Sequence, residues 1–279
     1  MSTNQQIHII ERSPQYWTAT FDHPPINMID SNTVAELDAL LTRLETDPQV
    51  RAVVFHSNDP DFFLAHYDVA LDRSKTPIRP VARTTGMHPW LDVLVRLSRA
   101  PVVSIASIRG RARGAGSEFI LACDIRFASA EKAIMGQFEV GAGAVPGGGP
   151  MVRLPGLMGR GRALEVLLGA DDFPGELAER YGYINRAVPD AELDDFSDAF
   201  ARRIAGFDKA AIRETKAFVD QDTLPPDQAF PPEMDAFFRS FGRTETQARM
   251  AALMRKGLGS RSDLEFKLGH YVGLENGKE

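Results

Sequence analysis

The sequence has little cysteine, since Cys123 is the only one among 279 residues. A single thiol cannot form an internal disulfide, and it excludes zinc ribbons and other cysteine clusters. Six histidines are present, but no pair has the i,i+4 spacing of a helical metal site, and no His-Glu-x-x-His sequence occurs. We therefore expect no metal site, and one thiol is typical of a protein from a reducing compartment.

The sequence also lacks an excess of basic charge and any long apolar run. It has 32 Lys and Arg against 38 Asp and Glu, a net charge of −6, and phosphate binding needs a concentrated basic face. Residues 1–6 are polar and do not resemble a signal peptide. No stretch approaches the roughly 20 apolar residues that cross a bilayer. We predict a soluble, cytoplasmic protein that binds neither nucleic acid nor membranes.

What the sequence does contain is an alternation of strand and helix patterns. The predicted strands are short and rich in branched or aromatic residues, and they span residues 7–10, 16–21, 50–56, 101–108 and 125–130. Apolar residues at helical spacing predict a first helix capped by Asp30, Ser31 or Asn32, and a second helix over residues 88–99. Alternation of this kind implies parallel βαβ crossovers.

The pattern changes along the chain. Residues 1–190 are predicted to form an α/β core, helices become frequent from Gly159, and residues 191–279 are predicted to form a helical region. Large apolar side chains recur in that region, namely Phe237, Phe238, Phe241, Met250, Leu253 and Met254. They are expected either to pack on their own core or to form a subunit interface, and the sequence leaves both alternatives open.

A glycine-rich turn at residues 110–116 follows a buried strand and precedes a predicted helix at residues 117–123. It is not a dinucleotide site, because Phe119 occupies the position of the third small residue, and no P-loop sequence occurs. Such a turn still presents backbone N–H groups at a helix N-terminus, where an anion or a developing oxyanion is stabilised. A plain strand-to-helix turn is the alternative.

A carboxylate lies beside each of two glycine-rich stretches. Glu118 is in the first turn of the predicted helix, and Glu139 precedes the second stretch, residues 141–149. Two such carboxylates suit general acid–base chemistry. The alternatives are a helix-dipole role for Glu118 and a solvated surface position for Glu139. A serine hydrolase is disfavoured, because Glu118 fills the last position of the Gly-x-Ser-x-Gly elbow.

Taken in order, these motifs resemble the signature of the enoyl-CoA hydratase/isomerase (crotonase) superfamily. Residues 101–125 resemble its buried strand, glycine-rich turn with Glu, and Cys-Asp pair. Residues 136–149 resemble its Gln-Pro-Glu-x-x-x-Gly-x-x-Pro-Gly loop, and residues 62–68 resemble its Phe-x-Ala-Gly-Ala-Asp segment. The resemblance spans roughly residues 7–189. It implies a crotonase-like α/β core, a superhelix of repeated ββα units, with a C-terminal helical region for trimerisation.

The resemblance also implies a site for an acyl-CoA thioester. The thioester carbonyl oxygen would lie between two backbone N–H groups, those of Tyr67 and Ala115. Glu118 and Glu139 fall on the family's two catalytic carboxylates, which in hydratases hold a water between them, whereas isomerases use one carboxylate. The presence of both favours hydration of a trans-2-enoyl-CoA over isomerisation.

Substrate contacts follow from the same resemblance. CoA would lie across residues 25–26 and 65–69, and the acyl chain would lie near Phe138 and residues 146–149. The implied contacts are Pro25, Ile26, Ala65, His66, Asp68, Val69, Gly114, Phe138, Pro146 and Gly147. Because CoA is part of the substrate, no separate cofactor is expected. The resemblance further implies a homotrimer or a dimer of trimers.

Three positions depart from the family pattern near this site. His66 replaces a glycine, Phe138 replaces a proline before Glu139, and Pro25 stands where a basic residue often binds CoA phosphates. These departures leave the acyl group open. Isomerisation, thioester hydrolysis, decarboxylation and non-catalytic acyl-CoA binding remain alternatives to hydration.

Overall fold

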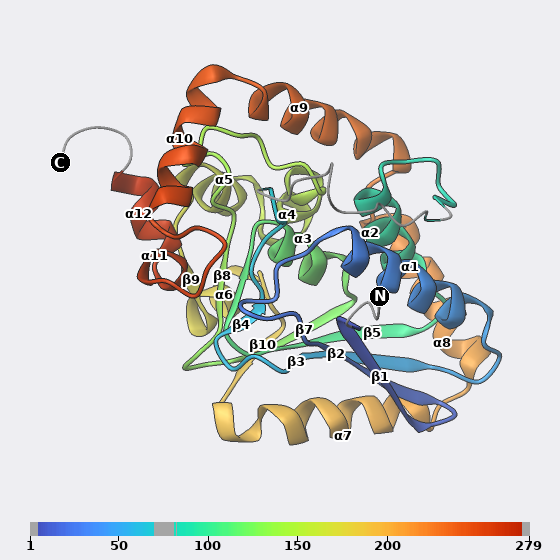
Figure 1. Cartoon of the computed structure of the whole chain (residues 1–279). Coiled ribbons are helices and arrows are strands. Elements are labelled where there is room, and N and C mark those ends of the chain that lie inside the picture. Colours follow the sequence, from blue (N-terminus) through green and yellow to red (C-terminus); the bar gives the residue numbers. More distant parts are fainter. Residues whose placement is uncertain (1–4, 70–80, 82, 275–279) are drawn as a thin grey trace.

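The fold is built on a six-stranded sheet (Figure 1). The computed structural model describes residues 5–69, 81 and 83–274. The strands follow one another across the sheet in the order β1 (Ile7–Ser13), β2 (Tyr16–Phe21), β3 (Ala52–Ser57), β5 (Val103–Ile108), β7 (Ile125–Ser129) and β10 (Arg186–Val188). β1 and β2 form an antiparallel hairpin, and all other neighbours are parallel. The predicted strands and parallel crossovers are therefore confirmed.

Helices cover both faces of this sheet, which explains the continuous apolar strands. In β3, Ala52 and Val54 pack in a cluster with α7 (Leu193–Ala205), while Val53 and Phe55 belong to the cluster on the other face. Successive side chains of a strand point to opposite faces, so both sets must be apolar. The helices on the face away from α7 are α1 (Ser31–Thr46), α2 (Pro89–Arg99) and α3 (Ala115–Ala122) (Figure 1).

Asp30, one of the three predicted candidates, is the residue that caps the N-terminus of α1. The carboxylate of Asp30 accepts hydrogen bonds from the backbone N–H groups of Asn32 (2.8 Å) and Thr33 (2.9 Å). Replacing such a cap by Ala typically costs about 1 kcal/mol. The predicted apolar positions of this helix, Val34, Leu37, Leu40, Leu41 and Leu44, are all buried.

A second, smaller sheet was not predicted from the sequence. Its strands are β4 (Phe62–Leu64), β6 (Arg111–Arg113), β8 (Ile134–Gly136) and β9 (Phe173–Pro174), in that order. Strands of two or three residues are too short to show an alternating pattern. The prediction for residues 110–116 is corrected accordingly: β6 occupies the middle of this turn, and α3 begins at Ala115 rather than Ser117.

After β7 the described residues are largely helical. The remaining helices are α4 (Pro150–Met158), α5 (Arg160–Gly169), α6 (Gly175–Tyr181), α8 (Lys209–Thr223), α9 (Pro231–Phe241), α10 (Thr244–Arg255), α11 (Asp263–Phe266) and α12 (Leu268–Leu274). The helix-rich part of the chain thus begins with α4 at Pro150, earlier than the predicted Gly159. The division into units at residue 190 stays a prediction, but the helical region packs on the core, because Leu253 and Leu268 share a cluster with Phe138.

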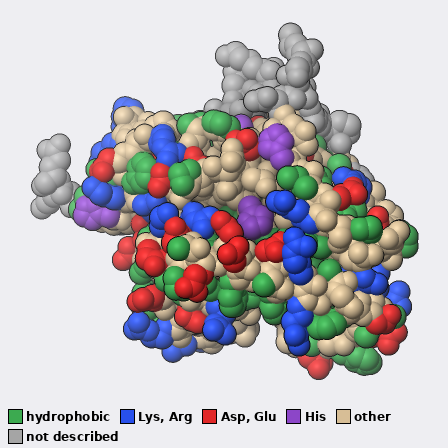
Figure 2. Space-filling view, turned by 90° about the horizontal axis from the view of Figure 1, so that it is seen from below, with side chains coloured by type: hydrophobic (Ala, Val, Ile, Leu, Met, Phe, Trp, Pro, Cys, Tyr) green, Lys and Arg blue, Asp and Glu red, His purple; other side chains and the backbone are tan. Residues whose placement is uncertain are grey.

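The surface carries charges of both signs. Figure 2 shows Lys and Arg side chains interspersed with Asp and Glu on the face that includes α7. None of the described helices is long and apolar enough to cross a membrane. Cys123 is buried and forms no disulfide.

Candidate active site

Three of the predicted site residues follow strands of the small sheet and lie at one edge of it. β4, β6 and β8 are parallel, and Tyr67, Ala115 and Glu139 each follow one of them by two or three residues. The carboxyl ends of parallel strands meet at one edge of a sheet, where ligand sites form. The sheet that the sequence did not reveal is therefore what assembles these distant residues.

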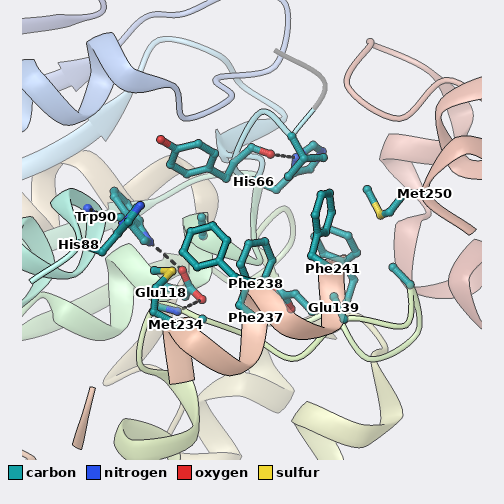
Figure 3. Close-up of a pocket in the computed structure, with 18 of the residues that line it drawn as sticks. His66, His88, Trp90, Glu118, Glu139, Met234, Phe237, Phe238, Phe241 and Met250 are labelled. Carbon is teal, nitrogen blue, oxygen red and sulfur yellow. Dashed lines mark hydrogen bonds between the residues drawn. The ribbon is translucent and has the colours of Figure 1, made fainter. Parts of the chain in front are cut away.

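A cavity of about 300 Å³ opens at this edge (Figure 3). Eight of the predicted site residues line it, namely His66, Tyr67, Val69, Ala115, Glu118, Phe138, Glu139 and Gly147. The other six, Pro25, Ile26, Ala65, Asp68, Gly114 and Pro146, are not among the described residues that line it. Both predicted carboxylates and both predicted oxyanion donors therefore belong to one cavity.

The six residues outside the cavity lining differ in their surroundings. Ile26 and Ala65 are buried with Phe62 in a small separate cluster, whereas Pro25 is exposed. Gly114 lies directly against the site: a Cβ there would be 2.7 Å from Glu139 Oε1, and its φ of +50° favours glycine. Their contacts with a substrate stay predictions.

Glu118 is buried and held by two hydrogen-bond donors. It is 4% exposed, and its Oε2 accepts from Trp90 Nε1 at 2.8 Å while its Oε1 accepts from the Gly148 N–H at 2.6 Å (Figure 3). A Cβ at Gly148 would lie 1.9 Å from Glu118 Oε2, so this approach requires glycine. Burial raises the pKa of Glu118, and the two N–H donors oppose that rise by stabilising the carboxylate.

Glu139 has a different environment on the same cavity. It is 9% exposed, so the alternative of a solvated surface carboxylate is wrong. Its loop is fixed by backbone hydrogen bonds, including Ala144 N–H to the Glu139 carbonyl at 2.8 Å, but its buried Oε2 has no partner among the described residues. Burial and then the charge of Glu118 raise the pKa of Glu139 to about 8.

The two carboxyl groups are therefore pushed toward opposite protonation states. Like charges in one buried site cannot both ionise freely. Glu118 receives N–H donors from two other residues, Trp90 and Gly148, whereas the hydrogen bond that lowers the pKa of Glu139 comes from its own backbone. This pattern of donors favours the charge on Glu118 and the proton on Glu139. A base and an acid facing one cavity is the arrangement that general acid–base catalysis needs.

Aromatic, methionine and leucine side chains form an apolar wall of the same cavity. The wall comes from α2, α9, α10 and the segment after α10, and its members are Trp90, Met234, Phe237, Phe238, Phe241, Met250 and Leu258. Sequence reasoning offered only core or interface roles for the phenylalanines and Met250. The i, i+3, i+4, i+7 spacing of Met234, Phe237, Phe238 and Phe241 was the available signal, since it defines one helix face.

The sequence provided no indication of one further residue near the site, Glu265, and only a partial interpretation of another, His66. His66 was identified only as a departure from a family pattern, and its ring Nε2 lies 2.8 Å from Glu265 Oε1 of α11. Glu265 is 1% exposed and carried no signal in the sequence. Among the described residues, no group of three or more His, Cys, Asp or Glu side chains is arranged to hold a metal ion.

Fold and site define an α/β protein in which two buried carboxyl groups face an apolar cavity. Residues 16–256 match the family model described as enoyl-CoA hydratase/isomerase. The chain is 29% identical over 250 residues to the short-chain-enoyl-CoA hydratase of Clostridium acetobutylicum, covering 89% of this chain and 94% of that protein. It is 30% identical over 251 residues to the crotonyl-CoA hydratase of Syntrophomonas wolfei, covering 89% and 95%.

A solved structure is also similar over its full length. A protein from Streptomyces avermitilis, provisionally described as an enoyl-CoA hydratase, has a TM-score of 0.91 and 40% sequence identity, covering 100% of this chain and 99% of that chain. The chain therefore belongs to the enoyl-CoA hydratase/isomerase family and has the crotonase fold.

Proposed function

We propose that this protein is an enoyl-CoA hydratase, which adds water across the C2–C3 double bond of a trans-2-enoyl-CoA. The observation that carries the proposal is the pair of buried carboxyl groups on one cavity, with N–H donors on Glu118 and none on the Oε2 of Glu139. Membership of the family and the names of two relatives support it.

The thioester carbonyl oxygen would be held by the backbone N–H groups of Tyr67 and Ala115. Ala115 is the first residue of α3, where a backbone N–H has no partner within the helix and the helix dipole favours negative charge. Both residues line the cavity. Loss of one oxyanion donor typically costs about 2.7–4 kcal/mol of transition-state stabilisation, so these donors are central to the proposal.

The proton transfers follow from the two protonation states. Glu118 accepts a proton from water as the water oxygen bonds to C3, and the π electrons of C2–C3 pass to the thioester as an enolate. The enolate collapses as C2 takes the proton of Glu139. Transfer of the proton from Glu118 to Glu139, directly or through solvent, resets the site, and the net change is the addition of one water. These steps use only residues of the chain and the substrate, so we propose that no separate cofactor takes part.

The apolar wall would hold the acyl chain, and CoA would leave the cavity past the loop that contains Pro25. Pro25 replaces a basic residue of the family pattern, but Arg261 reaches the Pro25 carbonyl at 3.3 Å. A guanidinium group therefore lies beside the position where the family pattern has its cation, and it is paired with the carboxylates of Asp59 and Asp61. To bind a CoA phosphate, Arg261 would have to exchange one of these partners.

For assembly we propose a homotrimer or a dimer of trimers. Large apolar side chains are exposed on α5 and α8, including Leu168 (63%), Phe218 (73%) and Val219 (56%), and exposed apolar surface of this kind suits a subunit interface. Light scattering that finds a monomer would contradict this assembly. A cytoplasmic location is proposed from the sequence alone.

The function is tested with crotonyl-, hexenoyl- and longer trans-2-enoyl-CoA substrates. We expect loss of the conjugated enoyl thioester absorbance and products heavier by one water. Glu118→Gln and Glu139→Gln should each lower the rate about 10²- to 10⁴-fold, the usual size of an acid–base contribution. An unchanged product mass indicates isomerisation, released CoA indicates hydrolysis, and binding without turnover indicates a non-catalytic protein. Each of these results would contradict the proposal.

A further inference from the structure

His66, which lines the cavity, forms a buried ion pair with Glu265, which does not line it. The ring Nε2 and Glu265 Oε1 are 2.8 Å apart, and the side chains are 4% and 1% exposed. The two residues are 199 positions apart in the sequence. Neither takes part in the proton transfers proposed above, so the pair needs a separate explanation.

The hydrogen bonds of His66 define its charge. Nε2 faces the Glu265 carboxylate, and Nδ1 lies 3.0 Å from the carbonyl oxygen of Tyr67 (Figure 3). Both partners are acceptors, so the ring donates from both nitrogens and is an imidazolium. Burial disfavours this charge, but Glu265 and the hydrogen bonds outweigh burial and raise the pKa of His66.

Glu265 is itself anchored to the strands that carry the site. Its Oε1 accepts from the Gly259 N–H at 2.7 Å, and its backbone carbonyl accepts from Arg113 Nη1 at 2.6 Å. Arg113 ends β6, two residues before Ala115, and His66 directly precedes Tyr67. The α11 segment therefore touches both chain segments that supply the proposed oxyanion donors.

Stability alone does not account for such a pair. A buried ion pair is often no more stabilising than apolar residues of similar volume, because both charges lose their hydration. The family pattern has a glycine at this position, which carries no charge. An imidazolium fixed beside the cavity, in contrast, stabilises negative charge that develops there during a reaction, because it is oriented in advance.

We propose that the His66–Glu265 pair positions the oxyanion hole, by holding the Tyr67 backbone and by keeping a fixed positive charge beside the developing enolate. The inference rests on the proposed function and deepens it. His66 is a positioning residue in this account, because it acts through the Tyr67 backbone and through its field. The charged groups that face it are Glu265 from α11, Asp68 from its own loop and Glu139 from the loop after β8.

Glu265→Gln tests the proposal, because it keeps the shape of the side chain and removes the charge that keeps His66 protonated. We expect kcat to fall about tenfold at pH 8, with KM changed less than twofold, because burial keeps the His66 ring neutral once the Glu265 charge is removed. A purely structural defect would also raise KM or reduce the folded fraction. The matched control is Asp263→Asn on the same helix, whose carboxylate is exposed and pairs with Lys267.

A second variant tests the proposal if Glu265→Gln folds poorly. His66→Gly combined with Glu265→Gln restores the family's glycine and leaves no unpaired buried charge. It should lose about as much kcat as Glu265→Gln alone, since the two residues act as one unit. Wild-type kcat in the folded double variant, or in folded Glu265→Gln, would overturn the proposal.

A ligand whose binding can be measured without catalytic turnover separates this inference from the proposed function. Acetoacetyl-CoA forms an enolate with its own ultraviolet band, so the bound enolate fraction reports the oxyanion site directly. We expect that fraction to fall in Glu265→Gln and to be unchanged in Asp263→Asn. If the wild type hydrates no enoyl-CoA but the enolate fraction still depends on Glu265, the proposed function fails and the pair's role stands. An enolate fraction that is the same in all three proteins overturns the pair's role.

Discussion

Trp90 donates its indole N–H to Oε2 of Glu118 at 2.8 Å, in the interior of the cavity. Trp90 comes from α2 and Glu118 from α3, two helices that pack on the same face of the large sheet. The contact supplies one of the two donors that keep a fully buried carboxylate charged. The proposed base therefore depends on a residue that the sequence did not mark as functional.

Trp90→Phe should move the acid limb of the pH–rate profile upward. A hydrogen bond to a charged group contributes about 1.5–3 kcal/mol, and one pKa unit corresponds to about 1.36 kcal/mol, so we expect a shift of about one to two units. The rate at neutral pH should fall, and it should recover only in part with rising pH, because Glu139 loses its proton as pH passes about 8. The measurement is kcat between pH 5 and pH 9.

Trp17→Phe is the matched control for this variant. Trp17 is also buried, but its Nε1 has no hydrogen-bond partner in the described structure, and it does not line the cavity. The pH–rate profile of Trp17→Phe should have the same midpoints as the profile of the wild type. An acid limb that is the same in Trp90→Phe as in the wild type would show that the indole does not set the charge of Glu118.

The alkaline limb should report the proton of Glu139. Its pKa is raised to about 8 by burial and by the charge of Glu118, and the proposed mechanism uses its protonated form. The rate should therefore fall as pH rises through about 8, and Glu139→Gln should abolish this limb along with most of the activity. Because the two carboxyl groups interact, the observed midpoints belong to the pair.

Glu233→Gln distinguishes Glu139 from another buried carboxyl group. Burial, and then the charge of Glu118, also raise the pKa of Glu233 to about 8, but Glu233 does not line the cavity. We expect Glu233→Gln to retain the alkaline limb. Loss of the limb in this variant would assign it to Glu233 and refute the role given to Glu139.

Gly148→Ala should inactivate the protein without unfolding it. The new Cβ would lie 1.9 Å from Glu118 Oε2, so the carboxylate must leave its position and lose its donors. We expect a loss in kcat of about 10²-fold or more, the size of an acid–base contribution. Gly156→Ala in α4 is the control, because its Cβ meets nothing within 4 Å, and it should be fully active and more stable by up to about 1 kcal/mol. Comparable activity in both variants would contradict the placement of Glu118.

The His66–Glu265 pair should also give the free energy of unfolding a defined pH dependence. The pKa of His66 is raised, so its contribution is complete below its ordinary value of 6.5 and is lost as pH rises through the folded value. The pKa of Glu265 is lowered, so its contribution is present above 4.5 and is lost as pH falls through the folded value. Urea unfolding should show the largest difference between wild type and Glu265→Gln between pH 4.5 and 6.5. A difference that does not change between pH 4 and pH 9 would rule out an ion pair.

Five of the six strands of the large sheet could be predicted from the sequence because each presents five to seven positions with a clear apolar pattern, whereas β10 has three residues. The small sheet could not, because β4, β6 and β8 have three residues each. The carboxylates at residues 118 and 139 were found through their glycine-rich surroundings and the family resemblance. Local sequence carries no sign of a partner that lies far along the chain, so neither the Trp90–Glu118 contact nor the His66–Glu265 pair could be predicted.

The apolar wall of the cavity shows a different limit of prediction from sequence. The spacing of Phe237, Phe238 and Phe241 revealed an apolar helix face, and the alternatives considered were core packing and a subunit interface. Only the placement of α9 over the cavity shows that this face lines a binding site. A periodic pattern predicts that a face is covered, and the tertiary structure decides what covers it.

The central claim is that Glu118 and Glu139 add water to an enoyl thioester. The most direct test is to incubate crotonyl-CoA with the protein in ¹⁸O-labelled water and to determine the mass and label position of the product. We expect 3-hydroxybutyryl-CoA with one ¹⁸O atom at C3, formed at a rate that falls at least about 10²-fold in Glu118→Gln and in Glu139→Gln. Recovery of unlabelled thioester of unchanged mass, or labelling by either variant at the wild-type rate, would contradict the roles of the two carboxyl groups.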